Sequence, residues 1–213
     1  MKRVEAFFGV LFVGVMGGYI HSAQAQSTPL KGYVMDIQMV PAVCALDKQK
    51  NKKRKCVEGY SLNIAGLYPE TNQSNCVTSS SASLSPLQAK VMSRVMPDIA
   101  AREQLWANYG GCVPVNASQY FRAIINLADR LNVPLELSAS ENKTVSIAQL
   151  RNQFIKLNKG MPSQALHLSC RALGKEYVLT GVSICYSTTS KYKQCPKYVT
   201  TNCPNTFLIK GSF

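Results

Sequence analysis

Few side chains in this sequence can move a proton near neutral pH. An imidazole is the side chain whose ordinary pKa lies closest to neutrality, and the chain has two histidines, His21 and His167. His21 belongs to an N-terminal segment that we expect to be removed. His167 alternates with apolar residues in "ALHLSC", a pattern more typical of a packed strand residue than of a catalyst. No serine stands in a recognisable nucleophile elbow, although a nucleophilic triad built from distant residues stays open.

Eight cysteines are the other reactive groups. An even number of cysteines in an exported chain predicts disulfides and an oxidising compartment. No two of them form a Cys-x-x-Cys pair, which argues against a zinc site and against a thioredoxin-like centre. The sequence also has no histidine-rich cluster and no glycine-rich phosphate loop, so we expect neither a metal nor a cofactor. The cysteines, whose pairing their spacing leaves open, are Cys44, Cys56, Cys76, Cys112, Cys170, Cys185, Cys195 and Cys203.

A strong positive charge limits the class of partner. The chain has a net charge of +13, of which the N-terminal segment contributes +1, leaving +12 for the remainder. Such an excess favours nucleic acid, acidic glycans or an anionic membrane surface. It is greatest in "KQKNKKRK", residues 48–55, where six of eight residues are basic. The alternative for this run is a solvated loop without a partner.

Residues 1–25 have the features of a secretory signal peptide. Two basic residues near the start precede an apolar run over residues 6–20, and Ala-Gln-Ala at 23–25 matches an Ala-x-Ala cleavage site. The alternative is a membrane anchor, but the run is shorter than the roughly 20 apolar residues that a membrane-spanning helix needs. We therefore predict one domain in residues 26–213, located in a periplasm or outside the cell.

Alternating apolar and β-branched residues predict strands near both ends of this domain. Two lie before the middle of the chain, at 32–40 and 60–68, with the basic run between them. Three more follow at 165–173, 176–186 and 206–213.

The intervening region has helical periodicity. Residues 86–109 predict two helices interrupted at Pro97. A longer amphipathic helix is expected at 116–132, with Ser118 as its N-cap, and another at 145–158. Strands at both ends with helices between them predict an α+β domain.

Three segments occur in an order and spacing typical of a known family. They are "IQMVPAVC" at 37–44, "LNIAGLYP" at 62–69 and "LWANYGGC" at 105–112. They resemble the landmark segments of the ribonuclease T2 family, which read Q-W-x-P-x-x-C, I-H-G-L-W-P and H-E-W-x-K-H-G-T-C. "YFRAIINLADRLNV" and "GVSICYSTTSKYKQCP" are similar to a later helix and to the C-terminal strand and hairpin of that family. The resemblance implies a ribonuclease T2-like α+β fold, with a central antiparallel sheet, several packed helices and disulfides.

The match separates structural positions from chemical ones. Met39 and Tyr68 take the places of two tryptophans. The chemical positions differ from the family motif at Ala65 and Tyr109, where the two catalytic histidines belong, and at Gln104, Leu105 and Asn108, where a histidine, a glutamate and a lysine belong. The matching structural positions are Gln38, Pro41, Cys44, Ile64, Gly66, Leu67, Pro69, Trp106, Gly110 and Cys112.

These departures bear on the chemistry that the resemblance implies. The family cleaves RNA without a metal, moving the 2′-hydroxyl proton to one imidazole while another protonates the leaving oxygen, which requires two groups with pKa values near the working pH. Ala65 carries no proton to exchange, and a tyrosine phenol ordinarily titrates near pH 10. Leu105 and Asn108 also lack the charges that would stabilise the phosphorane. We therefore predict an inactive member of the family.

The resemblance further implies a disulfide pattern. Each bridge is expected to contribute about 2–4 kcal/mol, mainly by restricting the unfolded chain. The implied pairs are Cys44–Cys56, Cys76–Cys112, Cys170–Cys203 and Cys185–Cys195.

The first functional hypothesis is a monomeric module that binds RNA or another polyanion without cleaving it. Aromatic faces stack on bases and lysines contact phosphates. For Trp106 a place in the core is the alternative, and for Tyr68 both interpretations stand. The candidate RNA-binding residues are Gln38, Tyr68, Trp106, Tyr109, Lys50, Lys52, Lys53, Arg54 and Lys55.

Two alternatives remain. One is an endoribonuclease of weak or altered activity that acts through Tyr109, His167 or a relocated group. The other is a secreted protein that binds another protein or an acidic surface. Binding with intact RNA supports the first hypothesis, cleaved RNA supports the enzyme, and a lack of RNA affinity supports the interaction protein.

Overall fold

The structure is a computed structural model that describes residues 29–47 and 54–212. The predicted signal peptide and most of the basic run, residues 48–53, lie outside these ranges. Within the described ranges, no helix is both long enough and apolar enough to cross a membrane.

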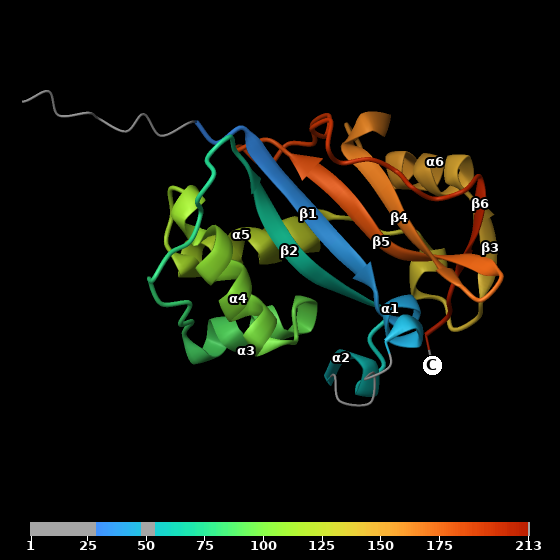
Figure 1. The fold of residues 1–213 in the computed structure, drawn as a ribbon, viewed down its shortest axis with the longest axis horizontal. Helices are drawn as coiled ribbons and strands as arrows, with labels where there is room; N and C mark the ends of the chain where they lie inside the picture. The colour runs from blue at the N-terminus through green and yellow to red at the C-terminus, as the bar shows by residue number, and fades with distance from the viewer. Residues whose placement is uncertain (1–28, 48–53, 213) are drawn as a thin grey trace, which may run out of the picture.

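A six-stranded sheet forms the centre of the molecule (Figure 1). Its order is β2-β1-β5-β6-β3, and β4 pairs with the other edge of β5. The pairs are antiparallel except for β5 and β6, which meet in parallel at Val178 and Leu208. The strands are β1 (Gly32–Met39), β2 (Leu62–Glu70), β3 (Lys143–Ser146), β4 (Leu166–Leu173), β5 (Glu176–Tyr186) and β6 (Thr206–Ile209).

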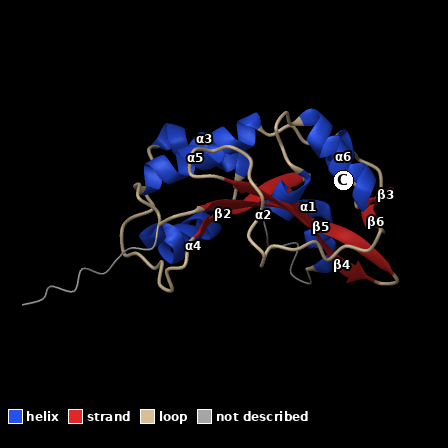
Figure 2. Ribbon diagram, turned by 90° about the horizontal axis from the view of Figure 1, so that it is seen from above, coloured by secondary structure: helices blue, strands red, loops and turns tan. Residues whose placement is uncertain are grey.

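Helices cover one face of this sheet. α3, α5 and α6 gather on the same side, which lies behind the sheet in Figure 1 and above it in Figure 2. The α+β prediction is therefore confirmed. The helices are α1 (Val40–Leu46), α2 (Arg54–Val57), α3 (Pro86–Val95), α4 (Ile99–Tyr109), α5 (Ala117–Arg130) and α6 (Ile147–Leu157).

The alternation along β1 separates the core from the open face. Met35, Ile37 and Met39 are buried in the main core cluster with the residues of α5. Because successive side chains of a strand point to opposite faces, Asp36 and Gln38 lie on the face that these helices leave uncovered.

Short polar residues begin the long helices. Ser85, Asp98 and Ser146 each accept a hydrogen bond from a backbone N–H in the first turn of the helix that follows. The prediction of Ser118 as the cap of α5 is wrong. Asn116 is the cap, because it forms a reciprocal capping box with Gln119.

The sequence patterns missed two elements. The strand predicted to end at residue 40 gives way there to α1, because Pro41 at the start of α1 favours a first helical turn. The helix predicted from residue 145 begins two residues later, because Val145 pairs with Phe207 in β3 and Ser146 caps the helix.

All eight cysteines are paired, and none is free. Cys44–Cys56 joins α1 to α2, and Cys76–Cys112 joins the polar loop after β2 to the end of α4. The remaining bridges are Cys170–Cys203 and Cys185–Cys195. These are the pairs that the family resemblance implies.

A buried hydrogen bond fixes β2 against α5, and its removal is the first prediction. The Tyr120 hydroxyl donates to the Leu67 carbonyl at 2.5 Å, and Tyr120 is 1% exposed. Tyr120→Phe leaves that carbonyl without its partner, so the free energy of unfolding should fall by about 1–3 kcal/mol. Urea unfolding measures this loss. Tyr177→Phe, at a tyrosine that is 50% exposed, is the control, and an equal loss in both variants would contradict this role.

Candidate functional site

The segments that resemble the catalytic landmarks of the family meet where β2 passes α4. The Tyr68 and Tyr109 rings lie edge to face, with centroids 5.1 Å apart and 80° between their planes. A Cβ atom at Gly66 would lie 2.7 Å from the Tyr68 ring and 2.9 Å from Leu105 Cδ1. Tyr68 and Leu105 therefore lie directly over the β2 backbone, at an approach that only glycine permits.

Ala65 is the additional residue of a β-bulge. Asp36 pairs with Gly66 and the next residue, Ile37, pairs with Ile64, so Ala65 has no partner on β1. A bulge redirects a side chain and is common beside active sites. Ala65 is half-buried, and its methyl group can neither give nor accept a proton.

α4 distributes its predicted site residues between surface and core. Gln104 and Asn108 are exposed and Tyr109 is half-buried, whereas Leu105 is buried against β2. None of the four supplies a charged group where the resemblance implies a glutamate, a lysine and two imidazoles.

Trp106 is not available to stack on a base. Its side chain is 3% exposed, and its Nε1 donates to the Ser80 carbonyl at 3.0 Å. Its ring centroid lies 5.6 Å from that of Tyr120 in the core. The assignment of Trp106 as an RNA-binding candidate is therefore wrong, and the alternative of a core tryptophan is correct.

A buried carboxylate lies on the same sheet face as Tyr68. Ser183 on β5 donates a hydrogen bond to Asp36 Oδ1 on β1 at 2.6 Å. Burial raises the pKa of Asp36, and the hydrogen bond from Ser183 opposes that rise. Sequence reasoning missed this pair, although a charged residue inside the apolar strand "GYVMDIQMV" is a signal that could have found it.

The phenol of Tyr68 stays protonated near neutral pH. Burial raises the pKa of Tyr68 to about 12, and the nearby Asp36 and Tyr109 add to the effect. Tyr68 therefore offers an aromatic surface and a hydrogen-bonding hydroxyl, but no base.

His167 lies on this face at a distance from Ala65. In the strand register, His167 on β4 is opposite Ser183, Ser183 is opposite Asp36, and Asp36 is opposite Gly66. Three inter-strand spacings separate the two ends of this row, roughly 14 Å. His167 and a group at Ala65 therefore cannot flank one phosphodiester.

Gln38 lies at another part of the face, beside a pocket of about 470 Å³. Its Oε1 accepts a hydrogen bond from Lys55 Nζ at 2.6 Å. Asp47, Arg171 and Thr180 also line this pocket. The other basic candidates lie outside the described part of the chain, namely Lys50, Lys52, Lys53 and the side chain of Arg54.

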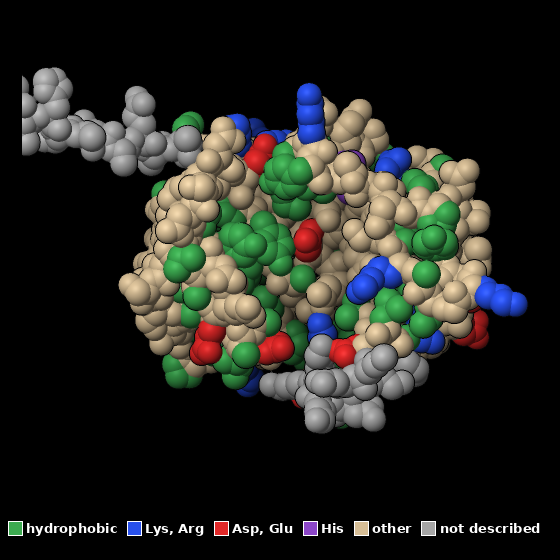
Figure 3. Space-filling view, in the orientation of Figure 1, with side chains coloured by type: hydrophobic (Ala, Val, Ile, Leu, Met, Phe, Trp, Pro, Cys, Tyr) green, Lys and Arg blue, Asp and Glu red, His purple; other side chains and the backbone are tan. Residues whose placement is uncertain are grey.

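The surface on this side has two halves (Figure 3). Hydrophobic side chains gather over the half that contains β2 and α4, and Lys and Arg side chains are more numerous over the half that contains β4 and β5. A strand of nucleic acid that crossed the sheet would meet aromatic groups at one end and basic groups at the other.

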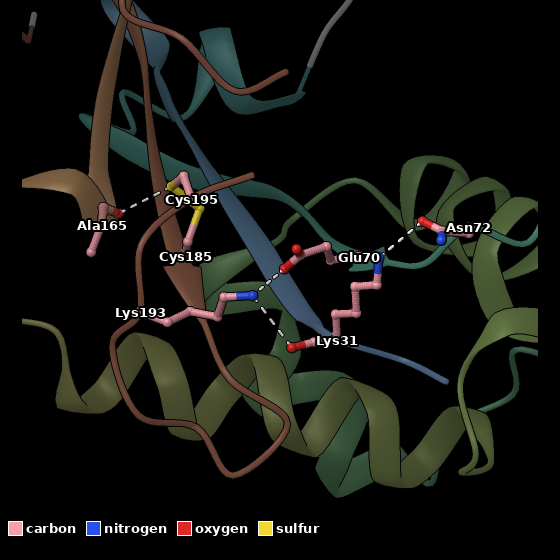
Figure 4. A network of polar contacts seen from close by, with 7 residues as sticks. All are labelled: Lys31, Glu70, Asn72, Ala165, Cys185, Lys193 and Cys195. Atoms are coloured by element: carbon pink, nitrogen blue, oxygen red, sulfur yellow. Dashed lines mark hydrogen bonds and ion pairs between the residues drawn. A yellow bond between two sulfur atoms is a disulfide. The ribbon is translucent and has the colours of Figure 1, made fainter. Parts of the chain in front are cut away.

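A polar network anchors the end of β2 to the segment after β5 (Figure 4). Lys193 Nζ lies 2.5 Å from Glu70 Oε2 and also donates to the Lys31 carbonyl at 3.4 Å. Lys31 Nζ donates in turn to Asn72 Oδ1 at 3.2 Å. The network holds the C-terminal segment against the end of β2.

Comparison with known proteins assigns the chain to a family. Residues 31–195 match the model of the ribonuclease T2 family, and the chain belongs to this family. No curated protein matches the chain.

Several solved structures share the fold. Ribonuclease MC1 from the seeds of bitter gourd has a TM-score of 0.66 at 17% identity, over 83% of this chain and 98% of that chain. The self-incompatibility-associated SF11-RNase of Nicotiana alata has a TM-score of 0.62 at 14% identity, over 83% and 96% of the two chains. The RNase-related protein from Calystegia sepium has a TM-score of 0.61 at 15% identity, over 84% and 96%.

The second prediction concerns the pH dependence of stability. Because the pKa of Asp36 is raised on folding, its ionisation removes stability as the pH rises from the ordinary aspartate range through the raised pKa. Asp36→Asn cannot ionise and keeps an acceptor oxygen for Ser183. It should raise the melting temperature at pH 7 and have little effect at pH 3, where Asp36 is protonated.

Thermal unfolding at the two pH values measures the difference. Asp129→Asn, at an exposed aspartate on α5, removes the same charge from the surface and is the control. An equal gain at both pH values, or an equal gain in the control, would show that the burial of Asp36 is not the cause.

Proposed function

We propose that this protein is an exported, catalytically inactive member of the ribonuclease T2 family that binds single-stranded RNA without cleaving it. The observation that carries the proposal is the pair Ala65 and Tyr109 at the meeting of β2 and α4. The resemblance assigns the two catalytic histidines to these positions. The one imidazole in the described chain, at His167, lies roughly 14 Å from Ala65 across the sheet.

The loss of activity follows from the protons available at this place. Cleavage needs one group to take the 2′-hydroxyl proton and another to protonate the leaving oxygen. Ala65 has no such group, and Tyr68 holds its proton because its pKa is raised to about 12. Leu105 and Asn108 supply no positive or acidic group to stabilise the phosphorane.

Three observations support RNA as the ligand. The chain has a net charge of +13, which favours polyanions. Variants of ribonuclease MC1, one of the similar structures, have been crystallised with 5′-UMP and with 5′-GMP. The half-buried rings of Tyr68 and Tyr109 supply aromatic surface, and the basic run supplies contacts to phosphates.

Two features support export. Residues 1–25 have the pattern of a signal peptide, and all eight cysteines are joined in disulfides. Disulfides form and persist in an oxidising compartment. A periplasm and the extracellular space both meet this condition.

RNA binding at Tyr68 is the third prediction. Tyr68→Ala should weaken the binding of a fluorescently labelled single-stranded RNA by about 1–3 kcal/mol, because one stacking surface is lost. Fluorescence anisotropy at several salt concentrations measures the affinity, and the dissociation constant should rise steeply with salt. Tyr177→Ala, at an exposed tyrosine on β5, is the matched control.

Each alternative gives a different result in this experiment. A large fall in melting temperature with unchanged affinity would make Tyr68 a core residue. If the unmodified protein does not bind RNA, the protein-interaction hypothesis replaces RNA binding.

The fourth prediction concerns the restoration of catalysis. The unmodified protein should not cleave RNA above background between mildly acidic and neutral pH. Ala65→His alone should change little, because acid and base act as a unit. Ala65→His with Tyr109→His should give at most a trace, and the addition of Leu105→Glu and Asn108→Lys gives the variant most able to cut. Robust cleavage by the unmodified protein that His167→Ala abolishes would show instead an enzyme with a rebuilt site.

A further inference from the structure

A second cationic pocket lies near the N-terminal end of β4. It has a volume of about 350 Å³. His167 from β4, Arg151 from α6 and Lys197 from the segment after β5 line it, and its lining contains no carboxylate. Three groups that can carry positive charge therefore converge from three separate segments.

These groups have no counter-ion within the part of the chain that the structure describes. Its ion pairs are Lys143–Glu136 and Lys193–Glu70, and neither involves Arg151, His167 or Lys197. Arg151 Nε is buried without a hydrogen-bond partner in the same part of the chain. A buried unpaired donor costs free energy, and such a group in a native structure often marks a ligand contact.

The imidazole of His167 is held in its neutral form. Burial lowers its pKa, the Arg151 guanidinium lowers it further, and the Gln164 carbonyl opposes these effects. Its Nδ1 lies 3.3 Å from Thr201 Oγ1. Of the segments that contact the ring, α6 contributes Arg151, the segment after β5 contributes Lys197 and Thr201, and neither contributes an acid.

The neighbouring strand also leaves this histidine without a carboxylate partner. Opposite His167 on β5 is Ser183, whose hydroxyl already donates to Asp36 on β1. Asp36 is two strands from His167. A cation-lined pocket with a neutral imidazole therefore has the electrostatic properties that favour an anion from solution.

We propose that this pocket binds a phosphate group, held by Arg151 and Lys197 beside the imidazole of His167. A guanidinium matches two phosphate oxygens at once, and a lysine adds a point charge. The unpaired Nε of Arg151 gains an acceptor when the phosphate binds.

Two sources can supply this phosphate, a free phosphate or phosphomonoester and the backbone of RNA. The second source rests on the proposed function. Tyr198 lies in the same segment as Lys197, is 69% exposed and is within electrostatic reach of Asp36. Tyr198 therefore offers an aromatic contact between the pocket and the sheet face that contains Tyr68.

The test is an NMR titration of the His167 imidazole in the purified protein. Spectra of His167→Gln assign its signals and separate them from those of His21. Inorganic phosphate, added at constant ionic strength against chloride, should bind saturably and raise the pKa of His167 by about one pH unit, because a bound anion favours the imidazolium.

Variants locate the binding site. Arg151→Gln should raise the pKa of His167 in the absence of phosphate, because a repelling charge is removed, and should weaken phosphate binding at least about tenfold. Lys156→Gln removes the same charge from an exposed position on α6 that does not line the pocket, and should leave the response unchanged. Lys197→Gln, at an exposed side chain, is the second pocket variant if Arg151→Gln does not fold.

A parallel titration with a uridylate decamer distinguishes the two sources. A response to phosphate shows the site, and a response to RNA alone identifies the backbone as its source. The proposal is overturned if neither ligand changes the His167 signals, or if Lys156→Gln weakens phosphate binding as much as the pocket variants do. RNA that binds without a response at His167 contradicts this site alone, whereas a response to phosphate without RNA affinity contradicts the proposed function alone.

Discussion

The close approach of two side chains to the backbone of Gly66 is the constraint on which the site depends. Tyr68 and Leu105 occupy the space where any other residue at position 66 would place its Cβ. The residue before it, Ala65, is a bulge, and the carbonyl of the residue after it, Leu67, accepts the hydrogen bond of Tyr120. Three consecutive residues of β2 are thus fixed by pairing, by packing and by a buried hydrogen bond.

This local geometry explains how catalytic groups can be lost while the scaffold remains. A bulge at position 65 would orient a histidine as readily as an alanine, and α4 presents Tyr109 next to Tyr68 without needing an imidazole. Leu105 replaces a charged group with apolar contact to β2, which favours burial over electrostatics. In the proposed mode of binding, the aromatic half of the face contacts bases and the basic half contacts phosphates.

The sequence predicts the framework of the fold better than the details of the site. Periodicity correctly indicates the main strands and helices, because one face of each is buried. It misses α1, because Pro41 follows an apolar strand without a break in pattern, and it misses β3, because only Val145 of that short edge strand is buried. Local propensity does not contain the pairing that makes Val145 a strand residue.

The site was predictable only in part, for a similar reason. Motif similarity locates Ala65, Leu105 and Tyr109 along the chain, but Trp106 shows that a motif position does not fix exposure. The pair of Asp36 and Ser183 joins residues that are distant in sequence, and only the register of β1 with β5 brings them together. The convergence of Arg151 and His167 likewise depends on the tertiary fold.

The central claim is that this ribonuclease T2 family member binds RNA and releases it uncut. Mass spectrometry of a defined single-stranded RNA, recovered from its complex with the unmodified protein after prolonged incubation, tests the claim most directly. We predict that the RNA retains its full mass. Fragments that end in 2′,3′-cyclic phosphate would contradict the account, because they require the proton transfers that Ala65 and Tyr109 cannot perform.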